Sequence, residues 1–170
     1  MTIGERVQID HMTVTKNGIN IKHFQGWERK SKYIDAGVFS HAKASSAKRF
    51  LLDFVERAPF PIESIQVDGG SEFMAEFEDA CATLNIPLIV LPPKKPEYNG
   101  GVERGNRTFR EEFYNRADLF EDSVRGMQAA LSKALVKYNT YRPHRNLKGL
   151  TPMQYIKNTL SETSILSHSI

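Results

Sequence analysis

Three acidic residues stand where folding can bring them together, two at the ends of short apolar segments and one near a predicted helix start. Asp10 follows the segment 7–9, Asp68 follows the segment 65–67, and Glu103 lies in a third region. Carboxylate oxygens are hard ligands that suit Mg²⁺ or Mn²⁺. Two such ions can stabilise the attacking and leaving oxygens of a phosphodiester displacement. These residue types therefore predict a metal-dependent site for phosphoryl transfer.

Each carboxylate also has a simpler structural interpretation. An Asp before two glycines, as at Asp68, is typical of a turn. Glu103 and Arg107 are four residues apart, and a surface ion pair between them would contribute only about 0.2–0.5 kcal/mol. Asp10 within an apolar strand is harder to explain structurally, because a buried carboxylate without a partner is costly.

Three motifs resemble those of the DDE recombinases, which include retroviral integrases and bacterial insertion-sequence transposases. Residues 68–73 (DGGSEF) are similar to the second-Asp motif, although Gly69 stands where the family more often has Asn. Residues 99–104 (NGGVER) resemble the third-carboxylate motif, and residues 138–152, with YRPH and LTP, are similar to the end of transposase cores. The resemblance covers residues 6–158. Asp68 and Glu103 have 34 residues between them, one fewer than is typical of retroviral integrases, which points to the transposase side.

This resemblance implies an RNase H-like catalytic core over residues 1–158. The residues that follow are Ser-rich and weakly patterned, so we expect a flexible tail over 159–170. It implies that Asp10, Asp68 and Glu103 are the catalytic residues and hold two Mg²⁺ ions, for which Mn²⁺ substitutes. It also implies DNA cleavage and strand transfer during transposition or integration, with DNA as the partner and a homodimer or larger homo-oligomer as the assembly. Two alternatives stay open: an RNase H-like nuclease without strand transfer, and a degenerate core that only binds DNA or self-associates.

The apolar pattern predicts an α/β fold with a mixed five-stranded sheet flanked by helices. Strands over 7–14, 19–27 and 32–39 form an antiparallel meander, with Asn17-Gly18 in the first turn. Two short strands, 64–67 and 87–91, add a parallel pair. The helices are expected near 40–58, with Ser40 as the N-cap, and around 73–84, 99–117, 121–138 and 152–158.

Several basic and polar residues near Glu103 are candidates for DNA contacts, because cations bind backbone phosphates. A solvent-exposed charged face is the competing interpretation. These residues are Lys94, Lys95, Asn99, Arg104, Arg107 and Arg110. Asn106 is expected either to make a buried hydrogen bond or to contact DNA. His11 should face away from Asp10, since neighbouring residues in a strand alternate in direction.

Composition indicates a globular protein and sets few further limits. The chain has 170 residues, a net charge of +3 and a single cysteine, Cys81, so an intrachain disulfide is impossible. No apolar segment approaches the ~20 residues of a membrane span. We expect a bacterial cytoplasmic setting, at the nucleoid when the protein is on DNA. We also expect an isolated catalytic core, because only a few residues precede the first predicted strand and no paired His and Cys spacing suggests a zinc module.

Overall fold

A five-stranded mixed sheet forms the centre of the computed structural model, which describes all residues except 1, 17, 93–97, 117–122 and 168–170. The strands are β1 (Val7–Lys16), β2 (Ile19–Glu28), β3 (Ile34–Phe39), β4 (Ile65–Val67) and β5 (Leu88–Val90). Their order is β3-β2-β1-β4-β5. The pairs β1/β2 and β2/β3 are antiparallel, whereas β1/β4 and β4/β5 are parallel. The predicted meander and parallel pair are therefore confirmed.

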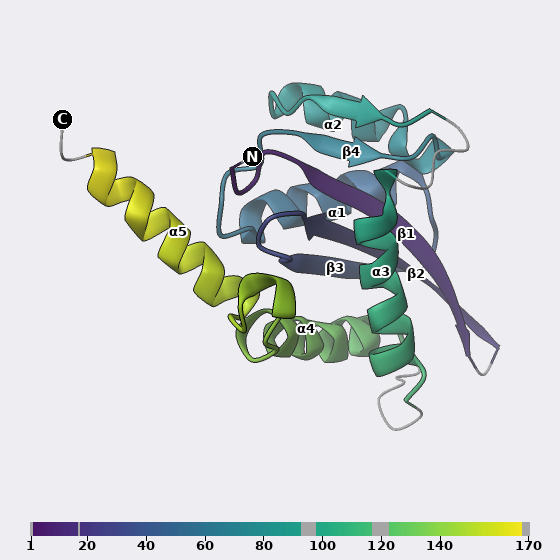
Figure 1. Ribbon diagram of the computed structural model, residues 1–170. Coiled ribbons are helices and arrows are strands. Elements are labelled where there is room, and N and C mark those ends of the chain that lie inside the picture. Colours follow the sequence, from purple (N-terminus) through teal and green to yellow (C-terminus); the bar gives the residue numbers. More distant parts are fainter. Residues whose placement is uncertain (1, 17, 93–97, 117–122, 168–170) are drawn as a thin grey trace.

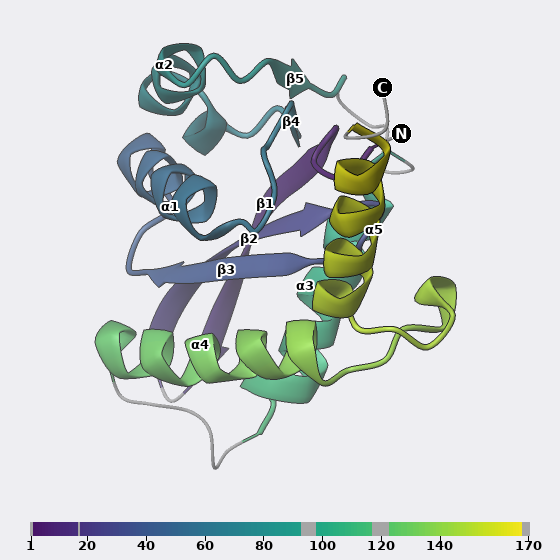
Figure 2. The same ribbon diagram turned by 90° about the vertical axis from the view of Figure 1, so that its left-hand side faces the viewer.

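Helices cover both faces of this sheet (Figures 1 and 2). The helices α1 (Ala44–Arg57) and α2 (Glu76–Thr83) pack on one face. The other face carries α3 (Gly100–Phe109), which continues into a π-helical turn (Arg110–Tyr114), and α4 (Val124–Thr140). Short 3-10 turns occur at Ser71–Phe73 and Arg145–Leu147, and α5 (Pro152–Ser167) extends to one side of the molecule (Figure 1).

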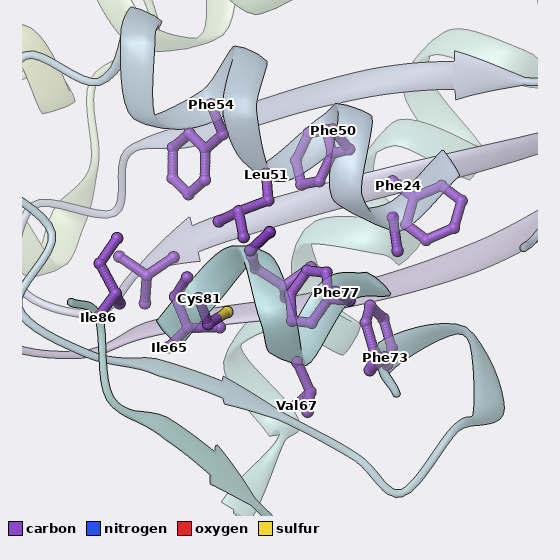
Figure 3. Packing of buried hydrophobic residues seen from close by; sticks show 14 of the residues in the cluster. Phe24, Phe50, Leu51, Phe54, Ile65, Val67, Phe73, Phe77, Cys81 and Ile86 are labelled. Carbon is purple, nitrogen blue, oxygen red and sulfur yellow. The ribbon is translucent and has the colours of Figure 1, made fainter. Parts of the chain in front are cut away.

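Two apolar layers fill the space between sheet and helices, because alternate strand residues point to opposite faces. On the α1 and α2 side, aromatic rings dominate, including Phe24, Phe50 and Phe77 (Figure 3). On the opposite side, aliphatic residues of α4 pack on β3. Asn139 of α4 also accepts a hydrogen bond from Ile34 N at 3.1 Å and donates one to Ile34 O at 2.7 Å, which fixes α4 to an edge strand.

Two predicted helix boundaries are wrong. Ser40 does not cap α1, since its hydroxyl lies 2.9 Å from the His41 ring nitrogen and the helix begins after Lys43, which makes no side-chain cap bond. The last helix ends at Ser167 and not at residue 158. Thr159 and Ser161 fit the helix because their hydroxyls donate to carbonyls four residues earlier, to Tyr155 O at 2.9 Å and to Lys157 O at 2.8 Å. Over the described part of the chain, no helix is long and apolar enough to cross a membrane.

Candidate active site

The strand register places Asp10 and Asp68 at the same level of the sheet. In the parallel β1/β4 pair, Val7 faces Ile65 and Gln8 faces Gln66, an offset of 58 residues in both cases (65 − 7 and 66 − 8). The same offset aligns Asp10 with Asp68, which directly follows the last residue of β4. Because both carboxylates come from the same edge region of adjacent strands, their proximity follows from backbone pairing alone.

Asp10 is the most tightly held of the three predicted catalytic residues. Its Oδ2 accepts a hydrogen bond from Asn106 Nδ2 at 2.9 Å, and its Oδ1 accepts one from the backbone N–H of His11 at 2.8 Å. Burial raises the pKa of Asp10 to about 6; the His11 bond opposes this rise, and the negative charges of Asp68 and Glu103 add to it. The negative charges of Asp68 and Glu103 therefore act on Asp10, while the catalytic roles of the three residues stay a prediction.

Asp68 and Glu103 are more open to solvent than Asp10. Asp68 is exposed, and its Oδ1 accepts a hydrogen bond from Gly70 N at 3.0 Å, which holds the turn after β4. Glu103 is exposed in the first turn of α3. Among the residues that the structure describes, no three His, Cys, Asp or Glu side chains converge closely enough to hold a metal ion. The carboxylates thus face a common region without forming a closed cage.

The donor set nevertheless fits a divalent cation. All three groups are carboxylates, which are the hard oxygen ligands that Mg²⁺ and Mn²⁺ prefer. Burial, and to a smaller extent the negative charges of Asp68 and Glu103, raise the pKa of Asp10, and a cation between these groups would relieve the repulsion among them. The charge and the donor chemistry of the site suit a divalent cation, and the metal-binding role of the three residues stays a prediction.

Three buried glutamines that the sequence reasoning missed attach α3 to the sheet. Gln8 Nε2 and Gln66 Nε2 both donate to Tyr98 O, at 2.5 and 2.8 Å. Gln8 Oε1 accepts from Val102 N at 3.2 Å, and Gln25 Nε2 donates to Val102 O, also at 3.2 Å. These bonds hold the backbone immediately before Glu103 at both a carbonyl and an amide.

The sequence does contain a signal for two of these glutamines. Gln8-Ile9-Asp10 and Gln66-Val67-Asp68 repeat the same Gln-apolar-Asp pattern. Since residues two apart in a strand point to one face, each glutamine shares a face with its aspartate, while Ile9 and Val67 are buried in the core on the opposite face. The pattern places a polar support next to each carboxylate.

Two glycines allow α3 to lie close to the sheet. A Cβ at Gly101 would come within 2.5 Å of three ring carbons of Trp27, and a Cβ at Gly105 would come closer than 2.5 Å to Gln25 Nε2. Because these glycines are four residues apart, they occupy one face of the helix. That face meets β2, and the close approach brings Asn106 within bonding distance of Asp10.

His11 faces away from Asp10, as predicted. Its ring stacks on Phe24 with centroids 5.3 Å apart, and its Nδ1 lies 2.7 Å from Glu72 Oε1. This contact with Glu72 raises the pKa of His11, and the same contact lowers the pKa of Glu72. Glu72, which sequence reasoning did not single out, therefore ties the loop of Asp68 to β1 from the α1 side.

The predicted DNA contacts occupy different environments. Arg104, Arg107 and Arg110 are exposed along α3 and the turn that follows it, so a DNA backbone can reach them. Asn99 is buried, and its Oδ1 has no hydrogen-bond partner among the described residues. Lys94 and Lys95 lie outside the described residues. Asn106 takes the buried hydrogen-bonding role.

In the YRPH segment, Arg142 Nη2 donates a hydrogen bond to Glu112 Oε1 at 2.8 Å, which joins this segment to the turn after α3.

Comparison with known proteins places this geometry in a family. The integrase core domain family matches residues 84–152. The Pol polyprotein of Equine infectious anemia virus (strain Wyoming) is 31% identical over 135 residues, which are 79% of this chain and 11% of the polyprotein. A catalytic core domain of BIV integrase is 25% identical, covers 94% of this chain and 99% of its own, and superimposes with a TM-score of 0.73. This chain is a catalytic core of the DDE integrase and transposase family.

Other integrases share the fold of this core. The simian T-cell lymphotropic virus intasome, in complex with PP2A regulatory subunit B56 gamma, is 23% identical, covers 89% of this chain and 54% of its own, and gives a TM-score of 0.77. The HTLV-2 integrase catalytic core in complex with magnesium is 17% identical, covers 89% and 95%, and gives 0.73. The integrase core here spans about a tenth of the Pol polyproteins that it matches. Its fold is the predicted RNase H-like fold.

Proposed function

We propose that this integrase core cleaves DNA and joins the cut end to a target DNA, in a reaction that depends on two Mg²⁺ ions or on Mn²⁺ in their place. The observation that carries the proposal is the shared field of Asp10, Asp68 and Glu103 on the expected elements of an integrase fold. The solved HTLV-2 core in complex with magnesium supports the choice of metal.

The chemistry assigned to the site is an in-line displacement at phosphorus. Water or a DNA 3′-hydroxyl forms the new P–O bond as the bond to the leaving 3′-oxygen breaks, and the proton of the nucleophile passes to solvent. Asp10, Asp68 and Glu103 would hold the metal ions, which when bound promote ionisation of the attacking group and stabilise charge on the leaving oxygen. Asn106 keeps the Asp10 carboxylate in one orientation through its 2.9 Å bond.

DNA and further copies of the chain are the proposed partners. Exposed Arg104, Arg107 and Arg110 lie on the same helix as Glu103, where they can neutralise backbone phosphates near the reacting group. One of the structural neighbours is part of an intasome, and HTLV-2 cores are described in dimeric and trimeric forms. A dimer or larger assembly suits a reaction that must act on two DNA ends.

Metal titration with matched variants tests the function. Mg²⁺ and Mn²⁺ are titrated into the wild type, Asp10→Asn, Asp68→Asn and Glu103→Gln, with cleavage and joining of branched DNA as separate readouts. Glu111→Gln is the control, because Glu111 is an exposed acid further along the same helical segment. We expect metal-dependent activity in the wild type and the control, and its loss in the three folded variants.

Each of the other outcomes points to a specific error. Cleavage without joining would show a nuclease that lacks strand transfer. A folded wild type that binds no metal and leaves DNA intact would show that the core is degenerate. Full activity in any one of the three carboxylate variants would contradict the catalytic assignment of that residue.

A further inference from the structure

A basic pocket lies beside α3. It has a volume of about 710 Å³ and is lined on α3 by Gly101, Arg104, Gly105 and Thr108, but not by Glu103. The spacing of these four lining residues, i, i+3, i+4 and i+7, defines a single helix face. Cationic side chains surround the pocket: Arg6, Arg29, Lys32, Arg104, Arg142 and Arg145.

The positive charges of the basic pocket are only partly neutralised. No Asp or Glu is among its described lining residues. Arg142 is paired with Glu112, whose Oε1 lies 2.8 Å from Nη2. The charge of Glu28 acts to raise the pKa of Lys32, but the Glu28 carboxylate accepts hydrogen bonds from Lys30 N and from Ser31 N.

The lowered pKa of Lys32 and the unpartnered nitrogen atoms of lining residues indicate that cations crowd this pocket. Burial lowers the pKa of Lys32, and the positive charges of Arg29 and Arg104 lower it further, against the opposing effect of Glu28. Arg6 Nε and His144 Nε2, both on lining residues, are buried without a hydrogen-bond partner among the described residues. A buried guanidinium donor such as Arg6 Nε is costly unless a partner accepts from it. The pocket therefore has the positive charge and a free donor to hold an anion.

The lining of this pocket suits phosphate groups. Its cations are mostly guanidinium groups, whose planar forks match two oxygens of a phosphate. Gly100, the first residue of α3, also lines the pocket, and the start of a helix favours negative charge. The Asn99 side chain leaves that helix start uncapped. The volume is within the ~300–1,000 Å³ of typical ligand sites.

The basic pocket is also close to the reacting groups along the strands. Gln8 and Gln66 line the pocket, and each precedes a catalytic aspartate by two residues. Two strand residues span about 6.6 Å, which is roughly the rise of two nucleotides along a DNA strand at ~3.4 Å each. A DNA strand that runs along β1 and β4, with its scissile phosphate at Asp10 and Asp68, would therefore bring its next phosphates to the pocket.

We propose that the basic pocket binds DNA phosphodiester groups that flank the cleavage point, so that α3 is held between two backbone contacts. This site rests on the proposed function, because it assumes that DNA occupies the carboxylate side. It assigns DNA-positioning roles to Arg6, Arg29, Lys32 and Arg145, which no motif indicates. Free phosphate shares the same chemistry, and the experiment separates the two sources.

Salt-dependent DNA binding tests the pocket without any need for catalysis. A labelled DNA duplex is titrated in EDTA at several salt concentrations, with the wild type and the double variant Arg29→Ala/Arg145→Ala. Both arginines are exposed, so their removal should leave the fold intact, as a matched melting temperature would verify. Each lost phosphate contact lowers the slope of log K against log salt by about 0.9. We expect a slope lower by about 1.8 in the double variant and by about 0.9 in each single variant.

Lys48→Ala is the control, since Lys48 is a basic residue of α1 on the opposite face of the sheet; its slope should equal that of the wild type. An unchanged slope in the double variant would overturn the proposal. So would inorganic phosphate or polyglutamate binding that requires both arginines when DNA binding does not. A wild type that fails to cut DNA but shows the expected slopes would refute the proposed function and leave the pocket assignment standing.

Discussion

Substitution of Gly101 by Ala should displace the helix that carries Glu103. The new Cβ would lie 2.5 Å or less from three ring carbons of Trp27, whereas carbon atoms in contact need about 3.5 Å. The helix and the ring must therefore separate by at least about 1 Å. Overpacking of this kind costs about 1–3 kcal/mol, and a displacement near 1 Å can lower activity about 100-fold.

Gly100→Ala is the matched control for this prediction. A Cβ at Gly100 has no neighbour within 4 Å, and both variants gain helix propensity at adjacent positions of α3. The difference between the two variants therefore isolates the clash with Trp27. For a chain of this length, 1–3 kcal/mol corresponds to a melting temperature difference of roughly 2–12 °C.

Thermal melting and metal-dependent DNA cleavage should be measured on both variants in parallel. We expect Gly101→Ala to melt lower and cut more slowly, and Gly100→Ala to resemble the wild type. Adding Trp27→Leu to Gly101→Ala removes the ring and should recover part of the loss. If Gly101→Ala matches Gly100→Ala in both assays, the packing of α3 on Trp27 does not position Glu103.

Three other perturbations have calculable outcomes. The folded-state pKa of Asp10 is about 6 against an ordinary 3.8, so the folded state holds a proton that the unfolded state loses, and the free energy of unfolding falls as pH rises from about 4 to about 6. Asp10→Asn should therefore have a higher free energy of unfolding than the wild type at pH 7 in EDTA, by up to about 3 kcal/mol. Urea unfolding at pH 4 and pH 7 measures this difference, and equal free energies of the two proteins at pH 7 would contradict the reasoning. Gly69→Ala, at a glycine with no neighbour within 4 Å and no positive φ, should raise the unfolding free energy by about 0.4–1 kcal/mol; a loss in the same urea experiment would contradict this. Arg57→Ala leaves the Asp35 carboxylate, 4% exposed, without the partner that lies 2.8 Å away, and should cost about 3 kcal/mol, whereas a cost near zero would show that water replaces the guanidinium.

Local patterns predicted the sheet well because its pairing is encoded by short-range signals. The meander depends on alternating apolar residues and on the turn at Gly18, whose φ of +77° a glycine adopts without strain. The adjacency of Asp10 and Asp68 is different, because it depends on the parallel pairing of β1 with β4, whose paired residues are 58 positions apart (65 − 7). That pairing was expected from the resemblance to an RNase H-like fold and not from a local pattern.

Helix ends and supporting contacts were less predictable because they depend on tertiary partners. Ser40 has the right side chain for a cap, but it bonds to His41 and the helix begins later. The backbone carbonyl of Tyr98 receives two glutamines from different strands, and no local pattern specifies which carbonyl they will find. The contact between His11 and Glu72 likewise joins a strand to a loop that is 61 residues away (72 − 11).

The glycines of α3 explain why carboxylate placement alone does not make this site. A glycine inside a helix costs about 0.5–1 kcal/mol relative to Ala, yet Gly101 and Gly105 both face the sheet, where any Cβ would collide with Trp27 or Gln25. The cost is offset by proximity: only a helix this close lets Asn106 bond Asp10 at 2.9 Å and brings the charge of Glu103 into the field of Asp10. Larger residues at these two positions would keep all three carboxylates in the sequence and still separate them in space. The small size of Gly101 and Gly105, on the side of α3 that faces the sheet, is therefore as necessary for the proposed chemistry as the three acids.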